Sequence, residues 1–243
     1  MISSPWSGRS SDAPALTAPE RRVRPLVIEL VGPAGAGKST LARQLGDRLG
    51  ASGLPLGLWG LPLPRLAAHA ARLVPTFWGF VRDGQRPLWA EQTQLVRLET
   101  LSELVEGRRA AGRPVVLDEG PVFALSWIEV FYPRREGPRR AAWRRRVLAR
   151  WARLLDLIVL VDAPDPVLTY RLRTRTKAHP LKHSPDGVIH AFTARFRTAF
   201  HHVGAELRAA SGPRLVTLST GDEPSGRTVE RLVATVERSI DGD

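Results

Sequence analysis

The chain has 243 residues, a formal net charge of +12 at pH 7 and no cysteine. The lack of cysteine excludes disulfides and thiolate metal sites, and no apolar run approaches the roughly 20 residues of a membrane span. The length fits one large domain or two small ones with a proper hydrophobic core, and the cytoplasm is the simplest expected location.

Residues 1–24 are rich in serine and proline and end in a cluster of arginines. Such a segment has little apolar surface to bury, so we expect a disordered tail ahead of one domain over 25–243. Its Ser/Arg-rich composition also permits a weak organelle-targeting interpretation, but it lacks the apolar core of a signal peptide.

The strongest motif is a glycine-rich stretch with the phosphate-binding loop pattern GxxxxGK[ST]. The apolar run 26–31 precedes it and a helical pattern over 41–49 follows, and only roughly 0.003 chance matches are expected at this composition. Glycine permits a tight turn, so successive backbone N–H groups can form an anion cradle at the positive end of the helix. We expect the nucleotide to be bound by Gly32, Ala34, Gly35, Ala36, Gly37, Lys38, Ser39 and Thr40.

Two side chains of this loop have expected roles of their own. Lys38 should reach the β- and γ-phosphates, and the hydroxyl of Ser39 should hold Mg²⁺. Lysine is rare in this arginine-biased chain, and the other two lysines, Lys177 and Lys182, lie together in a later segment. Chance explains that pair as well as function does.

A short apolar run over 54–59 is the expected second strand, followed by helices over about 65–83 and 87–111. In nucleotide enzymes, helices at this place often form the acceptor side. The polar candidates on them are Arg65, His69, Arg72, Arg82, Gln92, Gln94 and Arg97. Solvated helix faces and packed aromatic side chains explain most of these residues, and Arg97 is the exception that we favour.

The next apolar strand starts at Pro114 and ends in Asp118 and Glu119. An acid at a strand end can hold Mg²⁺, directly or through water, and a second acid can orient or deprotonate a nucleophile. We expect Asp118 in the Mg²⁺ shell or as the base, with Glu119 as its partner. The pattern does not divide these two roles between the two acids.

Residues 134–153 carry nine arginines and one glutamate in a segment with helical spacing of Trp143, Val147 and Trp151. Three explanations are ordered by our preference. A solvated helix face comes first, an anionic small substrate second and a nucleic-acid surface third.

The apolar run 155–161 predicts a central parallel strand. A helix opened by Pro166 carries Arg171 and Arg175 one turn apart. The polar, broken segment 176–187 predicts a flap that can close over a triphosphate. Three elements complete the pattern: a helix over 189–210, a strand over 214–218 and a helix over 226–240.

Residues 25–240 resemble the thymidylate kinase-like branch of the P-loop kinases, which includes nucleoside and nucleoside-monophosphate kinases. Five strands alternate with helices; the first ends in the phosphate loop, the third in an acid and the fourth in Asp162-Ala163-Pro164. The resemblance implies an α/β, three-layer P-loop NTPase fold. Its five-stranded parallel sheet would have the order 2-3-1-4-5, with helices on both faces.

The same resemblance implies sites beyond the phosphate loop. In chain order these are an acceptor-binding Arg97, lid arginines Arg171 and Arg175 within a lid at about 171–187, and Thr220 and Gly221 near the adenine. Kinases of this branch are often dimers, so a homodimer is compatible with it.

Two departures from the family pattern bear on the acceptor. Glu119 stands where thymidylate kinases have an arginine that helps bind the acceptor phosphate, and Trp59-Gly60-Leu61-Pro62 replaces their acidic, glycine-containing acceptor loop. A carboxylate in place of that arginine argues against a nucleoside monophosphate. It favours a hydroxyl acceptor such as a nucleoside, a sugar or another metabolite alcohol.

We therefore predict a P-loop kinase that transfers the γ-phosphoryl group of MgATP to a small-molecule acceptor, with ATP and Mg²⁺ as cofactors. The alternative is a nucleotide-hydrolysing regulatory ATPase, in which Glu119 positions water and the arginine-rich helix binds a partner. The lid-like segment favours the kinase, and no Asn-Lys-x-Asp motif indicates a GTPase. A chain that binds nucleotide without turning it over is a third alternative.

Overall fold

The structure, a computed structural model, describes residues 25–51, 60–85, 87–133, 137–210, 212–221 and 225–240. The tail expected over 1–24 and the strand expected over 54–59 lie outside these residues. So do residues 134–136, where the arginine-rich segment begins.

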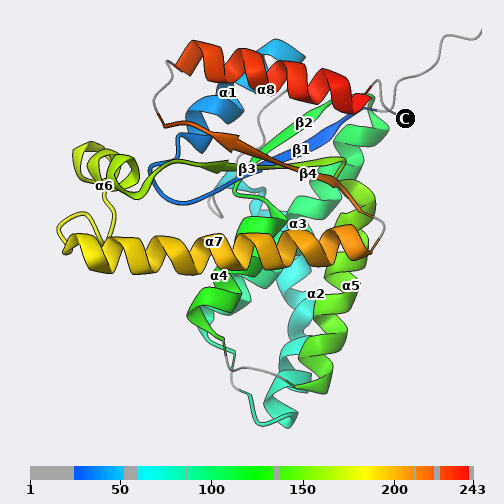
Figure 1. Cartoon of the computed structure of the whole chain (residues 1–243). Helices are drawn as coiled ribbons and strands as arrows, with labels where there is room; N and C mark the ends of the chain where they lie inside the picture. The colour runs from blue at the N-terminus through cyan, green and yellow to red at the C-terminus, as the bar shows by residue number, and fades with distance from the viewer. Residues whose placement is uncertain are drawn as a thin grey trace, which may run out of the picture.

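A parallel sheet of four strands lies at the centre of the described chain, in the order β2-β1-β3-β4 (Figure 1). The strands are β1 (Val27–Val31), β2 (Val115–Asp118), β3 (Leu157–Asp162) and β4 (Arg214–Ser219). We expected five strands, so the described sheet is one strand short. The 54–59 candidate was the second strand in the expected order 2-3-1-4-5. Without it the expected order is 3-1-4-5, and these four strands are the observed β2-β1-β3-β4.

The strands are apolar on both faces because helices cover both sides of the sheet. In β1, Ile28 and Leu30 point into one hydrophobic core, and Val27 and Val31 point into the other. All four side chains are fully buried. This alternation explains why β1 reads as a continuous apolar run, with the one exception of Glu29.

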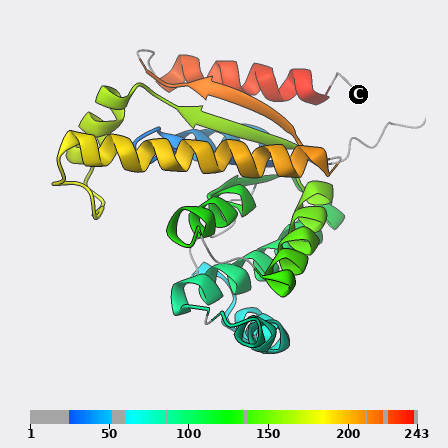
Figure 2. The same cartoon turned by 60° about the horizontal axis from the view of Figure 1, so that its bottom comes forward.

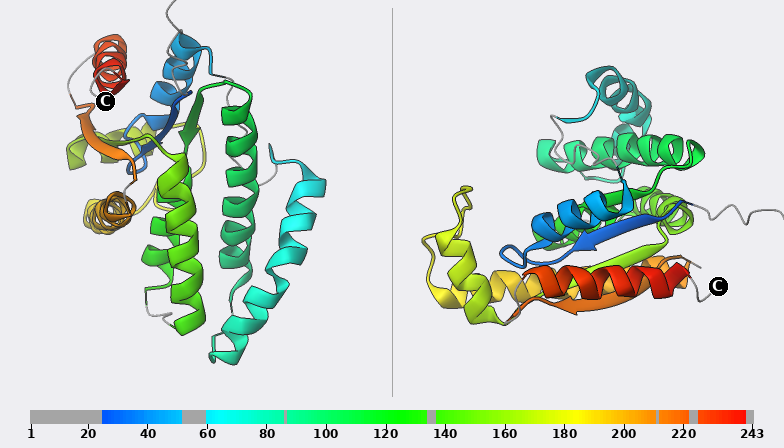
Figure 3. Two further views of the ribbon diagram at one scale, coloured as in Figure 1. Left: turned by 90° about the vertical axis from the view of Figure 1, so that its right-hand side faces the viewer. Right: turned by 90° about the horizontal axis from the view of Figure 1, so that it is seen from above.

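The helices form layers on the two faces of the sheet (Figures 1 and 2). On one face lie α1 (Lys38–Leu49) and α8 (Ser225–Ile240). On the other lie α3 (Trp89–Ala110), α4 (Pro121–Phe131), α5 (Pro138–Leu154) and α7 (Asp186–Ala209), with α2 (Leu63–Arg82) packed outside α3. The long helices α2, α3 and α5 extend well beyond the sheet (Figure 3).

Helix α4 has no counterpart among the expected elements. It starts at Pro121, directly after the acidic strand end, and is buried along most of its length. A helix that is covered on several sides lacks the polar stripe that a surface helix shows, so its periodicity is weak. This burial explains why sequence reasoning missed it.

Helix α6 (Asp165–Thr174) follows β3, and α7 already begins at Asp186. The segment between them, residues 175–185, is therefore shorter than the lid expected over 171–187, whose first residues are helical. No helix in the described part of the chain is long and apolar enough to cross a bilayer.

Candidate active site

The phosphate loop follows β1 and leads into α1, as the motif requires. Gly35 has a φ of 91° and Gly37 a φ of 88°, a region where side chains are strained. A Cβ atom at Gly32 would lie 1.9 Å from the carbonyl oxygen of Val161 in β3. The backbone path of this loop thus needs glycine at these three positions.

Lys38 is the first residue of α1 and is largely buried. Its Nζ donates a hydrogen bond to the carbonyl oxygen of Pro33 at 3.1 Å. Burial lowers the pKa of Lys38 from its usual value, whereas the nearby charges of Glu119 and Asp118 raise it. The lysine therefore lies folded over the loop, close to the two acids at the end of β2.

A cavity of about 750 Å³ opens on this loop. The residues predicted to bind the nucleotide come together along one side of it: Gly32, Ala34, Gly35, Gly37, Lys38, Ser39 and Thr40. Ala36 belongs to the same loop but is buried in the core between the sheet and α1. Arg171, Arg175 and Lys177 line the cavity from α6 and the segment that follows.

Glu119 is the one acid among the cavity-lining residues of the described chain. Among all described residues, Glu119 is also the only non-glycine residue with a positive φ, which is 69°. Such a backbone is costly for a glutamate, and strain of this kind concentrates at functional sites.

Asp118 lies beside Glu119 but does not line the cavity. Its Oδ1 is buried and has no hydrogen-bond partner among the described residues. An unpartnered carboxylate oxygen whose charge acts on Lys38 of the phosphate loop fits a hard cation such as Mg²⁺, which needs few protein ligands because it keeps waters. The described residues contain no cluster of three or more acids or histidines that would hold a metal by themselves.

Two charged residues that lie beneath the strand end brace it from the protein interior. Arg97 is 6 % exposed and donates hydrogen bonds to the carbonyl oxygen of Glu119 and, at 3.2 Å, to Oε1 of Gln94. Burial lowers the pKa of Arg97, while Glu119, Glu29 and Asp118 raise it. Arg97 was predicted to bind the acceptor; the structure places it behind Glu119, outside the cavity lining.

Glu29 is the second bracing residue, and sequence analysis did not single it out. Its buried carboxylate accepts the backbone N–H groups of Val122 at 3.0 Å and Phe123 at 3.1 Å, at the start of α4. Burial raises the pKa of Glu29 to about 7, although these hydrogen bonds and Arg97 lower it. A charge within an otherwise apolar strand is the signal that could have revealed this residue.

The predicted lid residues divide into two groups. Arg171 donates to the carbonyl and hydroxyl oxygens of Thr220 at 2.8 and 3.1 Å, so it ties α6 to the end of β4. The side chains of Arg175 and Lys177 form no hydrogen bond or ion pair with other described residues, and both line the cavity. Lys177 was noted only as one of a pair of lysines, and its position beside Lys38 makes it a further candidate.

Thr220 and Gly221 lie behind the phosphate loop. The hydroxyl of Thr220 donates to the carbonyl oxygen of Ala36 at 2.9 Å, and the carbonyl of Gly221 accepts weakly from Arg171 at 3.4 Å. Both were predicted to lie near the adenine, and neither is among the cavity-lining residues.

An aromatic wall lines part of the cavity, and sequence analysis missed it. Its members come from two helices: Phe123, Trp127 and Phe131 from α4, and Phe192, Phe196 and Phe200 from α7. Each set repeats every fourth residue, which places its members along one helix face. That shared spacing is a signal in the sequence, but only the packing of α4 against α7 turns it into a wall.

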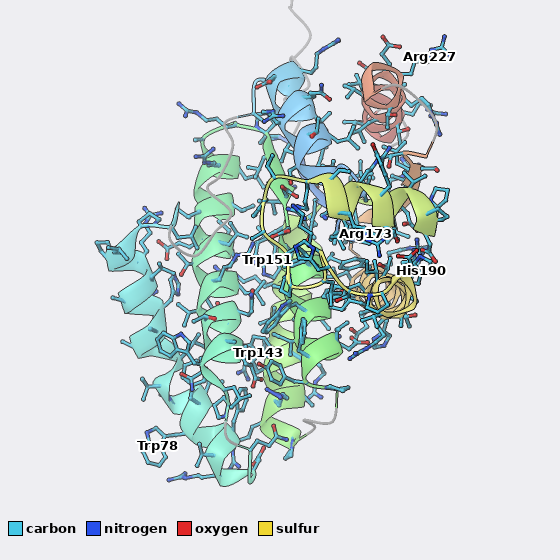
Figure 4. All side chains as sticks on the ribbon, turned by 90° about the vertical axis from the view of Figure 1, so that its left-hand side faces the viewer. Trp78, Trp143, Trp151, Arg173, His190 and Arg227 are labelled. Atoms are coloured by element: carbon cyan, nitrogen blue, oxygen red, sulfur yellow. The ribbon has the colours of Figure 1, made fainter. Side chains whose placement is uncertain are left out.

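The helices expected to form the acceptor side, α2 and α3, contribute no described residue to the cavity. Trp78 and Trp89 are 64 % and 78 % exposed, and Phe80 is buried in the core. Trp78 lies on the part of α2 that extends beyond the sheet, far from Arg173 of α6 (Figure 4). Among the described residues, the cavity is lined by α4 and α7 and not by α2 and α3.

Four arginines of α5 are paired with acids outside that helix. The pairs are Arg139 with Asp83, Arg140 with Glu91, Arg144 with Glu129 and Glu206, and Arg150 with Glu99 and Glu106. A solvated face was our preferred explanation for the arginine-rich segment. The structure shows instead that much of its charge ties α5 to α3, α4, α7 and the end of α2.

Comparisons with known proteins identify the fold. A family model described as an AAA domain matches residues 27–199. Thymidylate kinase from Candida albicans superposes with a TM-score of 0.55 at 14 % identity, covering 89 % of this chain and 94 % of that one. A deoxyadenosine kinase from M. mycoides superposes with a TM-score of 0.52 at 12 % identity, covering 87 % of this chain and 99 % of that one. No curated protein matches the chain closely enough to serve as a relative. The fold is that of the P-loop nucleoside and nucleotide kinases.

Proposed function

Since the chain belongs to the AAA domain family and has the fold of the P-loop kinases, we propose that it is an ATP-dependent kinase. It transfers the γ-phosphoryl group of MgATP to a hydroxyl of a small-molecule acceptor. One observation carries this proposal: a single cavity joins the phosphate loop, one carboxylate, two unpaired cations and an aromatic wall. The kinase domain spans residues 25–243.

The phosphate loop and Lys38 bind the triphosphate through backbone N–H groups and one ammonium group. Ser39 and Asp118 would hold Mg²⁺, which would supply positive charge to neutralise the triphosphate. The unpartnered Oδ1 of Asp118 supports this assignment. Thr220 supports the phosphate loop through its hydrogen bond to Ala36. We also propose that it lies near the adenine.

Glu119 is the acceptor's base in this proposal. Its carboxylate takes the proton of the acceptor hydroxyl as that oxygen attacks the γ-phosphorus, and the bond from phosphorus to the bridging oxygen of ADP breaks. Its position on the cavity and its constrained backbone support this role over Asp118. Arg97 then acts as a positioning residue, because it holds the carbonyl of Glu119 and not the acceptor.

The lid cations complete the site. Arg175 and Lys177 are available to neutralise charge on the transferred group, since no described residue pairs with them. Arg171 lines the same cavity but also anchors α6 to Thr220. We propose that Arg171 sets the position of the lid, about 171–187, from which the other two cations act.

The regulatory ATPase requires α5 as a partner-binding surface. The pairing of Arg139, Arg140, Arg144 and Arg150 with acids leaves less free charge on that helix for a partner. This observation favours the kinase. A homodimer and a cytoplasmic location stay predictions.

The decisive experiment detects a phosphorylated product. The protein is incubated with MgATP and a pool of nucleosides, nucleotides, sugars and other alcohols, and products are followed by mass spectrometry. Lys38→Ala should lower turnover by about 100-fold or more, because it removes a charge that contacts the reacting phosphates. Arg146→Ala, an exposed change on α5, is the matched control. Full activity in Lys38→Ala would overturn the assignment, and ADP with free phosphate alone would favour an ATPase.

A further inference from the structure

We infer that the acceptor is an alcohol with an apolar, aryl-sized body, which the aromatic wall of α4 and α7 holds while its hydroxyl reaches Glu119. This inference rests on the proposed kinase function and narrows its acceptor class. Sugars and nucleosides, which the sequence left open, then become poor acceptors.

The wall is continuous from one helix to the other. The ring centroids of Trp127 and Phe131 are 4.9 Å apart, and Phe131 lies 6.2 Å from Phe192 and 6.1 Å from Phe196. Phe123 stacks on Phe196 with an interplanar angle of 15°. Rings at these distances and angles form a preorganised surface that a flat apolar group can join.

The exposure of these rings shows that they do more than fill the core. Phe196 and Phe200 are buried and back the wall, as core residues do. Phe123, Trp127 and Phe192 are only half-buried, and Phe131 is 47 % exposed. An apolar surface that remains open toward a cavity gains most by covering itself with an apolar ligand.

The wall offers few groups that could bind a sugar or read the edge of a base. The hydroxyl of Thr193 donates to the carbonyl of Ile189 within its own helix at 2.8 Å, so its proton is already used. The charged residues of the described lining come from the phosphate loop, the end of β2 and the lid, and none from α4 or α7. Each buried hydroxyl without a partner costs affinity, which disfavours polyols here.

Glu119 connects this wall to the proposed phosphoryl transfer. It precedes Phe123 by four residues, at the turn that starts α4, so the base and the first ring of the wall share one structural element.

His179, in the segment between α6 and α7, also contacts the wall. Its ring lies 6.1 Å from that of Phe192 and edge-on to it. Its Nδ1 accepts the N–H of Leu181 at 3.2 Å, which leaves Nε2 as the protonated nitrogen of a neutral ring.

The test compares alcohols with the same primary hydroxyl and different bodies. Binding of 2-(2-naphthyl)ethanol and of glucose is measured by calorimetry on the wild-type protein saturated with Mg·ADP, and phosphorylation of both and of thymidine is measured with MgATP. We expect the naphthyl alcohol to bind, and to be phosphorylated with a kcat/KM at least about tenfold above those of glucose and thymidine.

Trp127→Ala should weaken binding of the naphthyl alcohol about tenfold, whereas Trp127→Phe should retain most of it. Trp78→Ala removes the same side chain from an exposed site outside the cavity and should change nothing. The affinity for Mg·ADP should be equal in all four proteins, which shows that each variant is folded.

The outcomes separate this inference from the proposed function. Preferred phosphorylation of glucose or thymidine would overturn the inference and leave the kinase standing. Binding of the naphthyl alcohol that depends on Trp127, without phosphorylation of any alcohol, would support the aromatic wall as a binding site and contradict the proposed kinase activity. No binding of the naphthyl alcohol to the Mg·ADP-loaded protein would overturn the inference.

Discussion

At the scale of single residues, the end of β2 concentrates groups that a stable fold alone would not select. Glu119 holds a left-handed backbone conformation that costs about 1 kcal/mol or more in a non-glycine residue. Asp118 has a buried oxygen without a partner in the described chain. Both features are unfavourable for stability, and both are explained when the strand end serves catalysis.

Substitutions of Glu119 and of Asp118 should lower activity in ways that depend differently on the Mg²⁺ concentration. Glu119→Gln should lower kcat by about 10² to 10⁴, the usual contribution of a general base, at every Mg²⁺ concentration. Asp118→Asn should instead raise the Mg²⁺ concentration needed for half-maximal activity, because it weakens one ligand. Steady-state kinetics over a Mg²⁺ titration measures both effects. Rescue of Glu119→Gln by high Mg²⁺ would exchange the two roles.

Glu29 should make stability depend on pH. Its pKa is raised to about 7 in the folded protein from about 4.5 in the unfolded chain, so the folded state binds the proton more tightly. The contribution of Glu29 to stability is then fully present below about pH 4.5 and is lost as the pH rises through 7, by about 3 kcal/mol at about 1.4 kcal/mol per pKa unit. Glu29→Gln cannot titrate and should lack this loss.

The measurement is urea unfolding of the wild type and Glu29→Gln at several pH values between 5 and 8. The difference in unfolding free energy between the two proteins should change with pH in favour of the variant as the pH rises. Other carboxylates titrate in both proteins and cancel in that difference. A difference that stays constant with pH would show that Glu29 is already charged or exposed.

At the scale of elements, α5 shows how a local charge run can serve the packing of helices. Arg150 donates to Oε1 and Oε2 of Glu106 at 3.0 and 2.9 Å and to Glu99 at 2.9 Å, and so links α5 to α3. A two-pronged arginine–carboxylate contact has the geometry in which such pairs contribute measurably. The arginine-rich segment therefore has a structural role that its composition did not reveal.

Arg150→Ala should accordingly lower the free energy of unfolding by about 1 kcal/mol. Arg146→Ala removes the same charge from an exposed position on the same helix and should change it by less than about 0.5 kcal/mol. Chemical denaturation compares the two variants at equal net charge. Equal effects would mean that Arg150 contributes through net charge alone.

At the scale of the whole molecule, the site is assembled from segments far apart in the chain. The phosphate loop, the turn after β2 and the segment after α6 meet at one cavity because parallel strands bring their carboxyl ends to the same edge of the sheet (Figure 1). Within residues 175–185, Arg175 and residues 177–181 line this cavity. A bound nucleotide should therefore stabilise the phosphate loop and the lid together.

Mg·ADP at 100 times its Kd should raise the free energy of unfolding by about 2.7 kcal/mol. Hydrogen exchange should slow in residues 175–185 as well as in the phosphate loop, because Arg175 and Lys177 gain a partner. Lys38→Ala should lose both effects at the same ligand concentration. Protection confined to the phosphate loop would show that the lid does not contact the nucleotide.

The sequence by itself determined the parts of this protein that depend on local pattern. Glycines at three positions of the loop are required by two positive φ angles and one close backbone approach, so the motif predicts its own geometry. Apolar runs located the four described strands, two of which end in an acid, and the family resemblance predicted their order. These features are encoded within a few consecutive residues, and for that reason they can be read without a structure.

Only the tertiary structure decided which residues meet. Arg97 and Glu29 brace the strand end from below, α4 and α7 form the aromatic wall, and the α5 arginines find acids on other helices. Each of these contacts joins residues distant in the chain, and each depends on which helix face is buried. Spacing every fourth residue predicts a stripe on a helix, but it does not tell whether that stripe faces a core, solvent or a ligand. The packing of the helices on the sheet settles that choice.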